Sequence, residues 1–451
     1  MKIQVPEKVN TIIETLLQHG HEAYAVGGCV RDSLLGREAD DWDITTSADP
    51  WEVKALFRRT IDTGIQHGTV TVMLDKEGFE VTTYRIDGEY EDGRHPKEVL
   101  FTKNLEEDLK RRDFTINAMA YNEQCGMVDI FGGAKDLDNK IVRCVGVAGD
   151  RFDEDALRIM RAFRFSAQLG FSIEEKTKMA AAERAENLKK ISAERIRTEL
   201  TKLLLSEHPD RLIWMMEHGI TKVVLPEFDA MFATEKNNGK FRYNVGEHTL
   251  CVIEFVGSKE RQKRYISQML PDFPAKEVIS EKHREKKELQ ILRYAALLHT
   301  TKEQAKKILQ RLKFDNETID TVMRLVAAHN EYLELCEDHN KNLTAMRHMI
   351  HRLGPDLMEL LWELQLADSL AGNQEQIEEV LGLLSETKKL HAEVLRRGDC
   401  ISLKQLAVNG RDLVAMGMAP GKQIGEQLEC FLQEVLENPE KNTKEYLLGL
   451  L

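Results

Sequence analysis

The chain has 451 residues, of which 42% are hydrophobic and 31% charged, and its formal net charge at pH 7 is −13. This balance is typical of a folded globular protein, and the length predicts roughly two to four domains. Taken alone, the acidic charge argues against a nucleic-acid-binding protein, although 63 Lys and Arg residues can still form a local basic face.

The cysteines and the apolar runs indicate the compartment. Seven cysteines are scattered without a CxxC pair, which argues against a zinc site or a disulfide framework and favours a reducing cytoplasm. The first residues, MKIQVPEKVN, lack the apolar stretch of a signal peptide, and no run is apolar enough to cross a bilayer. We therefore expect a cytoplasmic protein with no membrane partner, whose oligomeric state the sequence leaves unknown.

Hydrophobic periodicity predicts an α/β beginning and a helical remainder. Residues 8–19 have helical spacing, AYAVGG (23–28) is typical of a strand entering a glycine turn, and VRDSLL (30–35) predicts a helix. HGTVTVML (67–74) and FEVTTYR (79–85) predict two strands joined by a turn at residues 75–78. From about residue 150 onward almost every segment has the helical pattern.

The glycine turn is a candidate phosphate site. Gly28 follows a predicted strand and precedes a predicted helix, so backbone N–H groups there can approach phosphates. Arg31 would add a charge-assisted contact to a triphosphate. A Gly-Gly pair alone is more often an ordinary turn.

A pair of carboxylates follows within about twenty residues, which makes the combination more specific. Asp41 and Asp43 flank Trp42, and on an extended strand residues two apart face the same side. Two carboxylates so close repel each other unless a cation lies between them, and hard oxygen ligands suit Mg²⁺. Glu80, on a neighbouring predicted strand, is the candidate third carboxylate. Alone, a DxD pair is more often an exposed strand or loop.

With these residues the sequence resembles a known family. GGCVRDSLLG…DWD is similar to the head signature of class II tRNA nucleotidyltransferases, the CCA-adding enzymes and bacterial poly(A) polymerases of the DNA polymerase β superfamily. The resemblance implies an enzyme that adds CCA to the 3′ end of tRNA without a template, from CTP and ATP, with Mg²⁺ and with release of pyrophosphate.

The implied fold is of the α+β class. A polymerase-β-like nucleotidyltransferase head, with a mixed sheet and helices, would precede an extended all-α neck, body and tail. The expected domains are the catalytic head (1–142), a neck for nucleobase recognition (143–215), a degenerate HD-like helical body (216–370) and a tRNA-binding tail (371–451).

RRDFTINAMA (111–120) is similar to the family motif that contacts the ribose and the triphosphate. The resemblance implies that Arg112 contacts phosphate and that Asp113 and Asn117 recognise the sugar. A donor and an acceptor near the 2′-OH can separate ribonucleotides from deoxyribonucleotides. The alternative is a capped helix start with Asp113 as the N-cap, and both interpretations can hold at once.

EDALRIMRAFRF (154–165) resembles the family's EDxxR nucleobase template. Asp155 and Arg158 are three residues apart on a predicted helix and would share a face. A carboxylate accepts from the exocyclic amine of cytosine or adenine, and a guanidinium donates to the ring nitrogen; uracil and guanine present the opposite pattern. Arg161 and Arg164 would continue the row toward the phosphates. The alternative is a solvated helix with ion pairs along one face.

Two further stretches extend the resemblance. Residues 87–114 are similar to the flexible loop of CCA-adding and A-adding members, with Asp87, Arg94 and Pro96 in the family pattern. Because CC-adding members have this loop shortened, its presence favours addition of A; the alternative is a surface loop with no switching role. The segment 404–445 is similar to the tail that holds the outer part of tRNA.

The middle of the chain departs from relatives that carry a metal-binding HD segment. The corresponding histidines are His248, His299 and His329, but the HD aspartate is replaced by Thr300. A metal centre of that kind needs the aspartate. We therefore expect a degenerate, structural unit whose histidines have packing or surface positions.

Several functions stay open at this point. An A-adding tRNA nucleotidyltransferase or a poly(A) polymerase would share all of these motifs. Less favoured are an HD-type phosphohydrolase, which the three histidines alone support, and a non-catalytic tRNA-binding protein, which sits badly with the retained Asp41 and Asp43.

Overall fold

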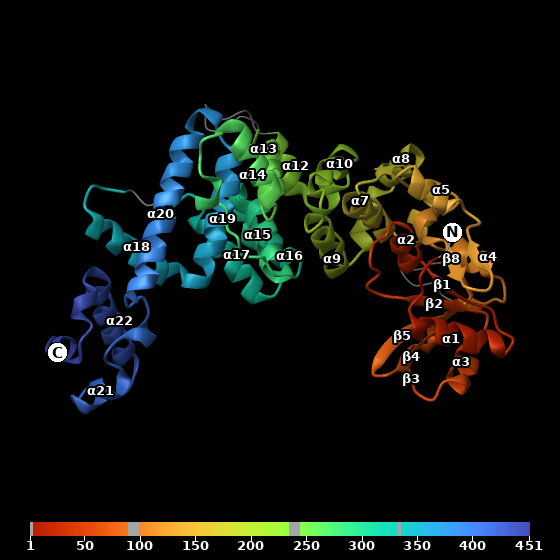
Figure 1. Cartoon of the computed structure of the whole chain (residues 1–451), viewed down its shortest axis with the longest axis horizontal. Helices are drawn as coiled ribbons and strands as arrows, with labels where there is room; N and C mark the ends of the chain where they lie inside the picture. Colours follow the sequence, from red (N-terminus) through yellow and green to blue (C-terminus); the bar gives the residue numbers. More distant parts are fainter. Residues whose placement is uncertain (1–2, 89–98, 234–243, 332–334) are drawn as a thin grey trace. The chain divides into compact units, whose positions relative to one another are not determined.

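The computed structural model describes residues 3–88, 99–233, 244–331 and 335–451. These residues form two compact units, Met1–Asp229 (the first unit) and Ala230–Leu451 (the second unit). The finer division into head, neck, body and tail at residues 142, 215 and 370 stays a prediction. The ribbon in Figure 1 follows the chain from strands and helices near the N-terminus to helices alone near the C-terminus.

The first unit begins with a seven-stranded mixed sheet in the order β3-β4-β5-β2-β1-β8-β9. Only β2 and β5 pair in parallel; the other neighbours are antiparallel. Its strands are β1 (Ala23–Val26), β2 (Asp43–Thr46), β3 (Thr60–Gly64), β4 (Thr69–Leu74), β5 (Glu77–Thr83), β8 (Ala120–Asn122) and β9 (Gly126–Val128). Two smaller pairs are β6 (Arg85–Asp87) with β7 (Val99–Phe101) and β10 (Ile141–Val142) with β11 (Ser172–Ile173).

The β4–β5 hairpin shows why these residues form strands. In β5 the side chains of Phe79 and Val81 are buried while Glu80 between them is exposed, which is the alternation of a half-buried strand. The hairpin turn is shorter than predicted, because Leu74 already pairs with Glu77. The two turn residues between them both have positive φ, as a type I′ turn requires.

Helices cover the sheet. The first five are α1 (Glu7–Gln18), α2 (Gly28–Leu34), α3 (Pro50–Leu56), α4 (Leu105–Lys110) and α5 (Gly133–Asp138). Helices α1 and α3 pack against the strands (Figure 1), and α3 begins with a capping box between Asp49 and Glu52. Leu105 and Leu109 of α4 pack on Tyr24 and Val26 of β1, so α4 covers the side of β1 to which these residues point.

From residue 148 to 232 the chain is mainly helical, as the sequence predicts. The helices are α6 (Ala148–Glu154), α7 (Leu157–Leu169), α8 (Glu175–Glu183), α9 (Ala193–Leu204), α10 (Leu212–Glu217), α11 (Thr221–Val224) and α12 (Pro226–Phe232). The short strand β11 is the exception, and α7 packs most extensively against α9. These helices position the side chains of the predicted nucleobase motif.

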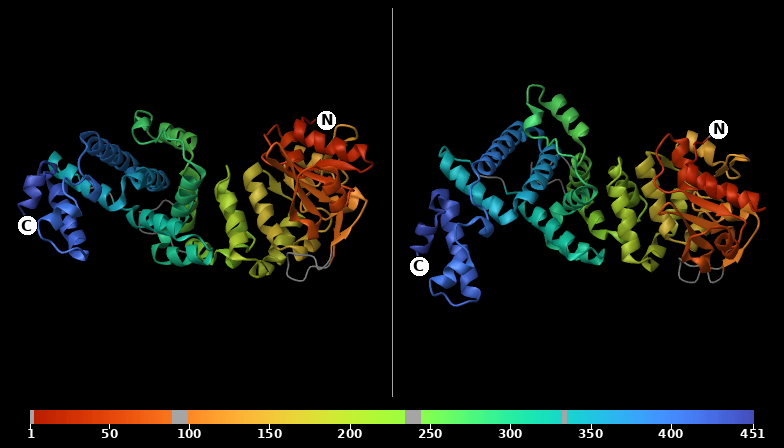
Figure 2. Two further views of the ribbon diagram at one scale, coloured as in Figure 1. Left: turned by 90° about the horizontal axis from the view of Figure 1, so that it is seen from below. Right: turned by 60° about the horizontal axis from the view of Figure 1, so that its bottom comes forward.

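The second unit is built from helices and the segments that connect them, as both views of Figure 2 show from green to blue. The helices are α13 (Val245–Phe255), α14 (Lys259–Met269), α15 (Lys286–Leu298), α16 (Lys302–Arg311), α17 (Asn316–Ala328), α18 (His339–Leu353), α19 (Pro355–Ala371), α20 (Ile377–Arg397), α21 (Gly410–Ala415), α22 (Lys422–Glu437) and α23 (Lys444–Leu448). The predicted α+β class is therefore confirmed. Within the described ranges, no helix has the length and apolar character of a membrane span.

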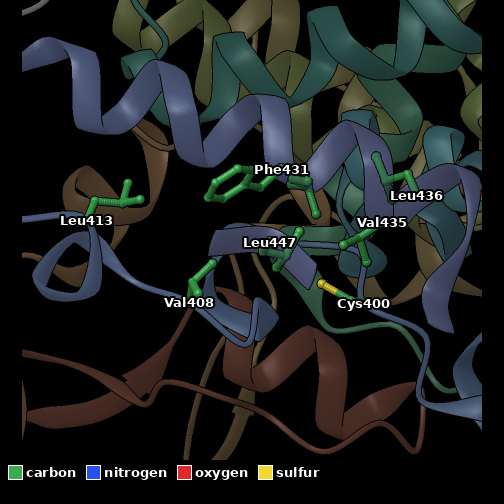
Figure 3. Close-up of a cluster of buried hydrophobic side chains, with 8 residues drawn as sticks. Cys400, Val408, Leu413, Phe431, Val435, Leu436 and Leu447 are labelled. Carbon is green, nitrogen blue, oxygen red and sulfur yellow. The ribbon is translucent and has the colours of Figure 1, made fainter. Parts of the chain in front are cut away.

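The last part of the second unit has its own hydrophobic cluster. Phe431, Val435 and Leu436 on α22 are buried against Val408 and Leu447 (Figure 3). Cys400 and Leu413 complete the labelled set and are also buried. The predicted tail thus contains a small packed core.

Candidate active site

The register of the sheet brings two of the predicted carboxylates together. Ile44 of β2 pairs in parallel with Val81 of β5, so the preceding residues, Asp43 and Glu80, lie opposite each other on the same face. Both are exposed, and so is Asp41. Asp41 precedes the strand, because β2 begins at Asp43, where pairing with Val26 starts; the prediction of one strand through 41–43 is therefore wrong.

The electrostatics of these carboxylates fit a divalent cation. Desolvation by neighbouring atoms raises the pKa of Asp43, and the charge of Asp41 adds to this effect while Arg112 opposes it. Desolvation likewise raises the pKa of Glu80, followed by the charges of Asp43 and Asp41. Asp43 and Glu80, whose ionised forms are destabilised, are oxygen donors whose charge a hard cation would neutralise, and Asp41 offers a third oxygen donor.

A buried aspartate that the sequence analysis did not name, Asp108, holds two arginines close to β2. Asp108 is fully buried; it accepts from Arg111 at 2.7 and 3.0 Å, from Arg112 at 3.5 Å and from Thr45 of β2 at 3.1 Å. Burial alone would raise the pKa of Asp108, but the two guanidinium groups lower it overall. Asp108 precedes Arg111 and Arg112 by three and four residues. This spacing brings side chains together on a helical turn, and it could have identified Asp108 from the sequence.

The glycine turn is built around Gly27. Its φ of 86° lies in the left-handed region, and a Cβ there would lie 3.1 Å from Nη1 of Arg112. Gly28, the predicted phosphate-site residue, is the first residue of α2 and has no such constraint. The left-handed φ therefore explains the first glycine, whereas the phosphate contact of Gly28 stays a prediction.

Arg31 points into the protein. The residue is 8% exposed, and its guanidinium donates to Asp32 at 2.9 and 2.7 Å and to Oδ1 of Asn117 at 2.6 Å. Asn117 in turn donates to Asp113 at 3.1 Å. Arg31 thus orients the side chains of the predicted ribose motif, and its direct contact with triphosphate stays a prediction.

Asp113 is a buried hub of this motif. Its Oδ1 accepts from the backbone N–H of Phe114 at 2.8 Å and its Oδ2 from Nε of Arg161 at 2.7 Å. Although burial opposes ionisation, Arg161 and then Arg158 lower the pKa of Asp113 to about 2. Asp113 is not a helix N-cap: the residue before the short 3₁₀ helix η2 (Thr115–Asn117) is Phe114, and no side chain caps that helix.

The predicted base-selecting pair lies at a break between two helices. Helix α6 ends at Glu154 and α7 begins at Leu157, so the prediction of a single helix through 154–165 is wrong. Asp155 has an extended backbone, and its Oδ1 accepts from the N–H of Leu157 at 3.0 Å. Its carboxylate therefore caps the first turn of α7, which disfavours an uninterrupted helix.

Each member of that pair has another partner. Arg195 of α9 donates to Oδ2 of Asp155 at 2.8 Å, while Arg158 donates to Glu154 at 2.6 Å and to the carbonyl of Arg111 at 2.9 Å. The sequence analysis missed Glu154 and Arg195 as partners. Glu154 stood within the motif, but Arg195 lies 40 residues away and only the packing of α7 on α9 reveals it.

Arg161 and Arg164 of the row, together with Arg31, lie near the ring of Phe165. The guanidinium of Arg164 lies 3.7 Å from the centroid of Phe165, and those of Arg31 and Arg161 lie at 5.0 and 5.4 Å. Arg164 is buried and pairs with Glu199 at 2.7 Å; burial lowers its pKa to about 10. Its predicted phosphate contact stays a prediction.

The first part of the predicted loop, residues 89–98, lies outside the described residues. The backbone of Asp87 ends β6, where it pairs with Val99, whereas Arg94 and Pro96 lie in the range that the structure does not describe. The predicted role of the loop is therefore untested.

The three histidines of the middle segment are buried in the second unit. His248 and His299 are 1% and 3% exposed, and the rings of His299 and His329 meet edge-on at 5.2 Å between centroids. Asp368, which the sequence analysis did not name, accepts from Nε2 of His248 at 2.9 Å. The histidines are thus buried, as expected for packing positions. In addition, the carboxylate of Asp368, 120 residues from His248 in the sequence, is hydrogen-bonded to His248.

Family models match three parts of the chain. Residues 23–143 match the poly A polymerase head domain, 170–232 match an RNA and SrmB-binding site of polymerase A, and 282–451 match tRNA nucleotidyltransferase domain 2. The matched ranges include Asp41, Asp43 and Glu80 but not Asp155.

Several similar proteins are described as CCA-adding enzymes. The chain is 36% identical over 450 residues to a CCA-adding enzyme of Lactobacillus helveticus, covering 98% of this chain and 97% of the relative. It is 54% identical over 198 residues to a CCA-adding enzyme of Lactiplantibacillus plantarum, but this match covers 44% of the chain and about half (49%) of that relative. The crystal structure of the Bacillus stearothermophilus CCA-adding enzyme in complex with CTP is 30% identical, with a TM-score of 0.67 over 99% of this chain and 98% of that chain.

Proposed function

The chain belongs to the family of CCA-adding enzymes, and from this premise we propose that it adds CCA to the 3′ end of tRNA without a template. CTP and ATP are the substrates, and pyrophosphate is released. The observation that carries the proposal is the similarity to the Lactobacillus helveticus enzyme, which runs through 98% of this chain. A head that transfers nucleotides and helical units that hold RNA are therefore expected together.

The carboxylates Asp41, Asp43 and Glu80 would hold the divalent cation on which the family's reaction depends, and we propose Mg²⁺ because all three ligands are hard oxygens. When bound, such an ion stabilises charge on the attacking 3′-oxygen and on the leaving pyrophosphate. Asp43 and Glu80 suit this role because both are exposed and they lie opposite each other on the paired strands β2 and β5.

Arg112, which lies near Asp43, would bind the triphosphate. Asp108 keeps its guanidinium near β2, so the positive charge lies within range of Asp43 before a nucleotide arrives. Asp113 and Asn117 would face the ribose, and their orientation depends on Arg31 and Arg161. A preorganised set of this kind limits the rearrangement that nucleotide binding requires.

Asp155 and Arg158 would select the base by exchanging partners. Asp155 would accept from the exocyclic amine of cytosine or adenine, and Arg158 would donate to the ring nitrogen. In the structure these groups are bonded to Arg195 and Glu154 instead. Uracil or guanine would place a carbonyl oxygen against the carboxylate of Asp155. Because neither oxygen can donate, the base could not replace the hydrogen bond that Asp155 accepts from Arg195.

The test uses tRNA transcripts that end before CCA, after C, and after CC. With Mg²⁺, CTP and ATP, we expect two cytidines and then one adenosine, and no extension with UTP or GTP. Addition of A alone would identify an A-adding enzyme, and long A tracts on generic RNA a poly(A) polymerase. If no tRNA end is extended with any nucleotide mixture, the proposal is wrong.

Location and domain roles complete the proposal. A cytoplasmic location fits tRNA as substrate, and all seven cysteines are free thiols in the structure. Residues 143–215 would form the neck that reads the base, 216–370 the helical body and 371–451 the tail that holds tRNA.

A further inference from the structure

A cavity of about 950 Å³ lies in the first unit, between α1 and the segment that joins α2 to β2. Its volume is that of a site for a small molecule. Its lining includes Glu7 and Glu14 from α1, and Arg37, Glu38 and Trp42 from the joining segment. We propose that this cavity binds a linear polyamine, an extended organic cation of the spermidine type.

The cavity lies on the other side of the sheet from the proposed cation site. Lys8 of α1 donates to Glu77 of β5 at 2.9 Å. Glu77 and Glu80 are three residues apart on the same strand, so their side chains point to opposite faces. Helix α1 therefore covers the face opposite Glu80 and Asp43, and a molecule in the cavity would not occupy the proposed nucleotide site.

The sequence of α1 gives the cavity a polar wall. The apolar residues of this helix are buried in the core, whereas Glu7, Thr11 and Glu14 are exposed and line the cavity. These positions, i, i+4 and i+7, fall on one face of a helix. Because a helix rises about 1.5 Å per residue, Glu7 and Glu14 start about 10 Å apart along this wall. A ligand that contacts both carboxylates must therefore be extended.

The lining has an excess of negative charge. Glu7, Glu14 and Glu38 have no ion-pair partner among the residues that the structure describes. The cationic side chain of the lining is Arg37, which donates to the backbone carbonyl of Gln168 at 3.3 Å. Three carboxylates against one guanidinium favour a cationic occupant over an anionic one.

The arrangement favours an organic polycation over a metal ion. One ion holds its oxygen ligands at about 2.0–2.6 Å, which carboxylates spaced as Glu7 and Glu14 are do not suit. Trp42 adds an indole ring, on which an ammonium group or the methylenes of an alkyl chain pack favourably. Amines separated by methylenes, as in spermidine, provide both the spaced charges and the apolar segments that these walls require.

The test titrates spermidine into the full chain by isothermal titration calorimetry, without tRNA or nucleotide, at about 50 mM salt. The parent carries Asp43→Ala and Glu80→Ala, so that polyamine held by the proposed cation site does not count. We expect one spermidine per chain with a Kd on the order of 100 μM. Glu14→Gln with Glu38→Gln should weaken the affinity at least about tenfold, because two ion pairs are lost. Spermidine should change the tryptophan emission of the parent but not that of Trp42→Leu.

The matched control is Glu123→Gln with Asp138→Asn, which removes the same charge from exposed positions of the first unit outside the cavity. It should keep the affinity within about twofold. Failure of the parent to bind spermidine, equal weakening in the control pair, or equal competition by Mg²⁺ at the same charge concentration would overturn the proposal. Because the parent lacks two carboxylates proposed for catalysis, the result is independent of the nucleotidyltransferase proposal.

Discussion

Charged side chains of the head fall into two groups at the scale of single residues. Asp43 and Glu80 are exposed on one face of two inner strands of the sheet, where β2 pairs with β5, and are proposed to contact a cation and a nucleotide. Asp108 and Asp113 are buried and hold arginines by charge-assisted hydrogen bonds. Substitutions in the first group should therefore change chemistry, and those in the second should also change stability.

The first prediction concerns Asp43→Ala. Loss of this carboxylate should lower the rate of nucleotide incorporation by at least about 1,000-fold, because it removes a ligand of the proposed cation. The affinity for tRNA, measured by filter binding, should stay within about twofold, because on the proposed division of roles the helical units hold the tRNA. Asp62→Ala removes an exposed carboxylate from β3 of the same sheet and should leave the rate unchanged. Equal losses in the two variants would count against the assigned role.

The second prediction concerns Asp113→Asn and pH. The folded pKa of Asp113 is about 2, below its ordinary value of 3.8, so the ionised form stabilises the fold above pH 3.8 and this contribution is lost as pH falls through 2. The shift corresponds to about 2 kcal/mol. Urea unfolding at pH 6 should therefore show the variant less stable by about 2 kcal/mol, and the difference should shrink as the pH approaches 2. A difference that is constant across this range contradicts the assignment.

The third prediction concerns Asp155→Ala. Without the carboxylate, the exocyclic amine of cytosine or adenine loses its acceptor, so the preference for CTP and ATP over UTP and GTP should fall at least about tenfold. Single-nucleotide incorporation with each triphosphate measures this ratio. Arg195→Ala, which removes the partner seen in the structure, is the comparison: it should change KM more than selectivity. Unchanged selectivity in Asp155→Ala would exclude the template role.

At the scale of elements, two short breaks in regular structure stand out in the first unit. The turn between β4 and β5 uses Asp75 and Lys76 with φ of 48° and 71°. The interruption at Asp155 separates the end of α6 from the start of α7. The turn depends on two positive φ angles that Asp and Lys seldom adopt, whereas the extended backbone of Asp155 suits an aspartate that caps the next helix.

The fourth prediction follows from the turn. Replacing Asp75 and Lys76 by Asn-Gly, the pair preferred in type I′ turns, should stabilise the first unit by on the order of 1 kcal/mol. The free energy of unfolding in urea measures the change. The reverse test, a β-branched valine in place of Lys76, should destabilise the hairpin. Destabilisation by Asn-Gly would show that the side chain of Asp75 or Lys76 supports the native turn.

The sequence predicted elements better than it predicted partners. Alternation such as Phe79-Glu80-Val81 indicates a strand from local residues, and the strands carrying Asp43 and Glu80 were placed correctly in one mixed sheet. The break at Asp155 was missed because the flanking residues all have helical periodicity. Arg195 and Asp368 were missed because their partners lie 40 and 120 residues away, where only tertiary packing reveals proximity.

At the scale of the whole molecule, an acidic chain is proposed to bind an acidic polymer. The net charge of −13 repels tRNA at long range, so binding would depend on arginines and lysines gathered locally. Many basic side chains of the first unit are already paired with carboxylates, as Arg158 is with Glu154.

The fifth prediction is therefore a steep dependence of tRNA affinity on salt. Phosphate contacts release counterions, so the affinity should fall at least about tenfold between about 50 and about 200 mM salt. Fluorescence anisotropy of a labelled tRNA measures the change, and circular dichroism over the same range verifies that the fold persists. An affinity independent of salt would argue against binding through phosphates.

The parallel pairing of β2 with β5 has a consequence for how the molecule matures. The hairpin between β4 and β5 can close within about 10 μs, because its strands are joined by a two-residue turn. Asp43 comes to lie opposite Glu80 only when β2 pairs in parallel with β5. This pairing requires the intervening segment, which contains α3 and β3, to fold first, and it is therefore a slower, non-local event. The surface that carries Asp43 and Glu80 is therefore assembled late, and the proposed activity of a nascent head would have to wait until β2 and β5 have paired.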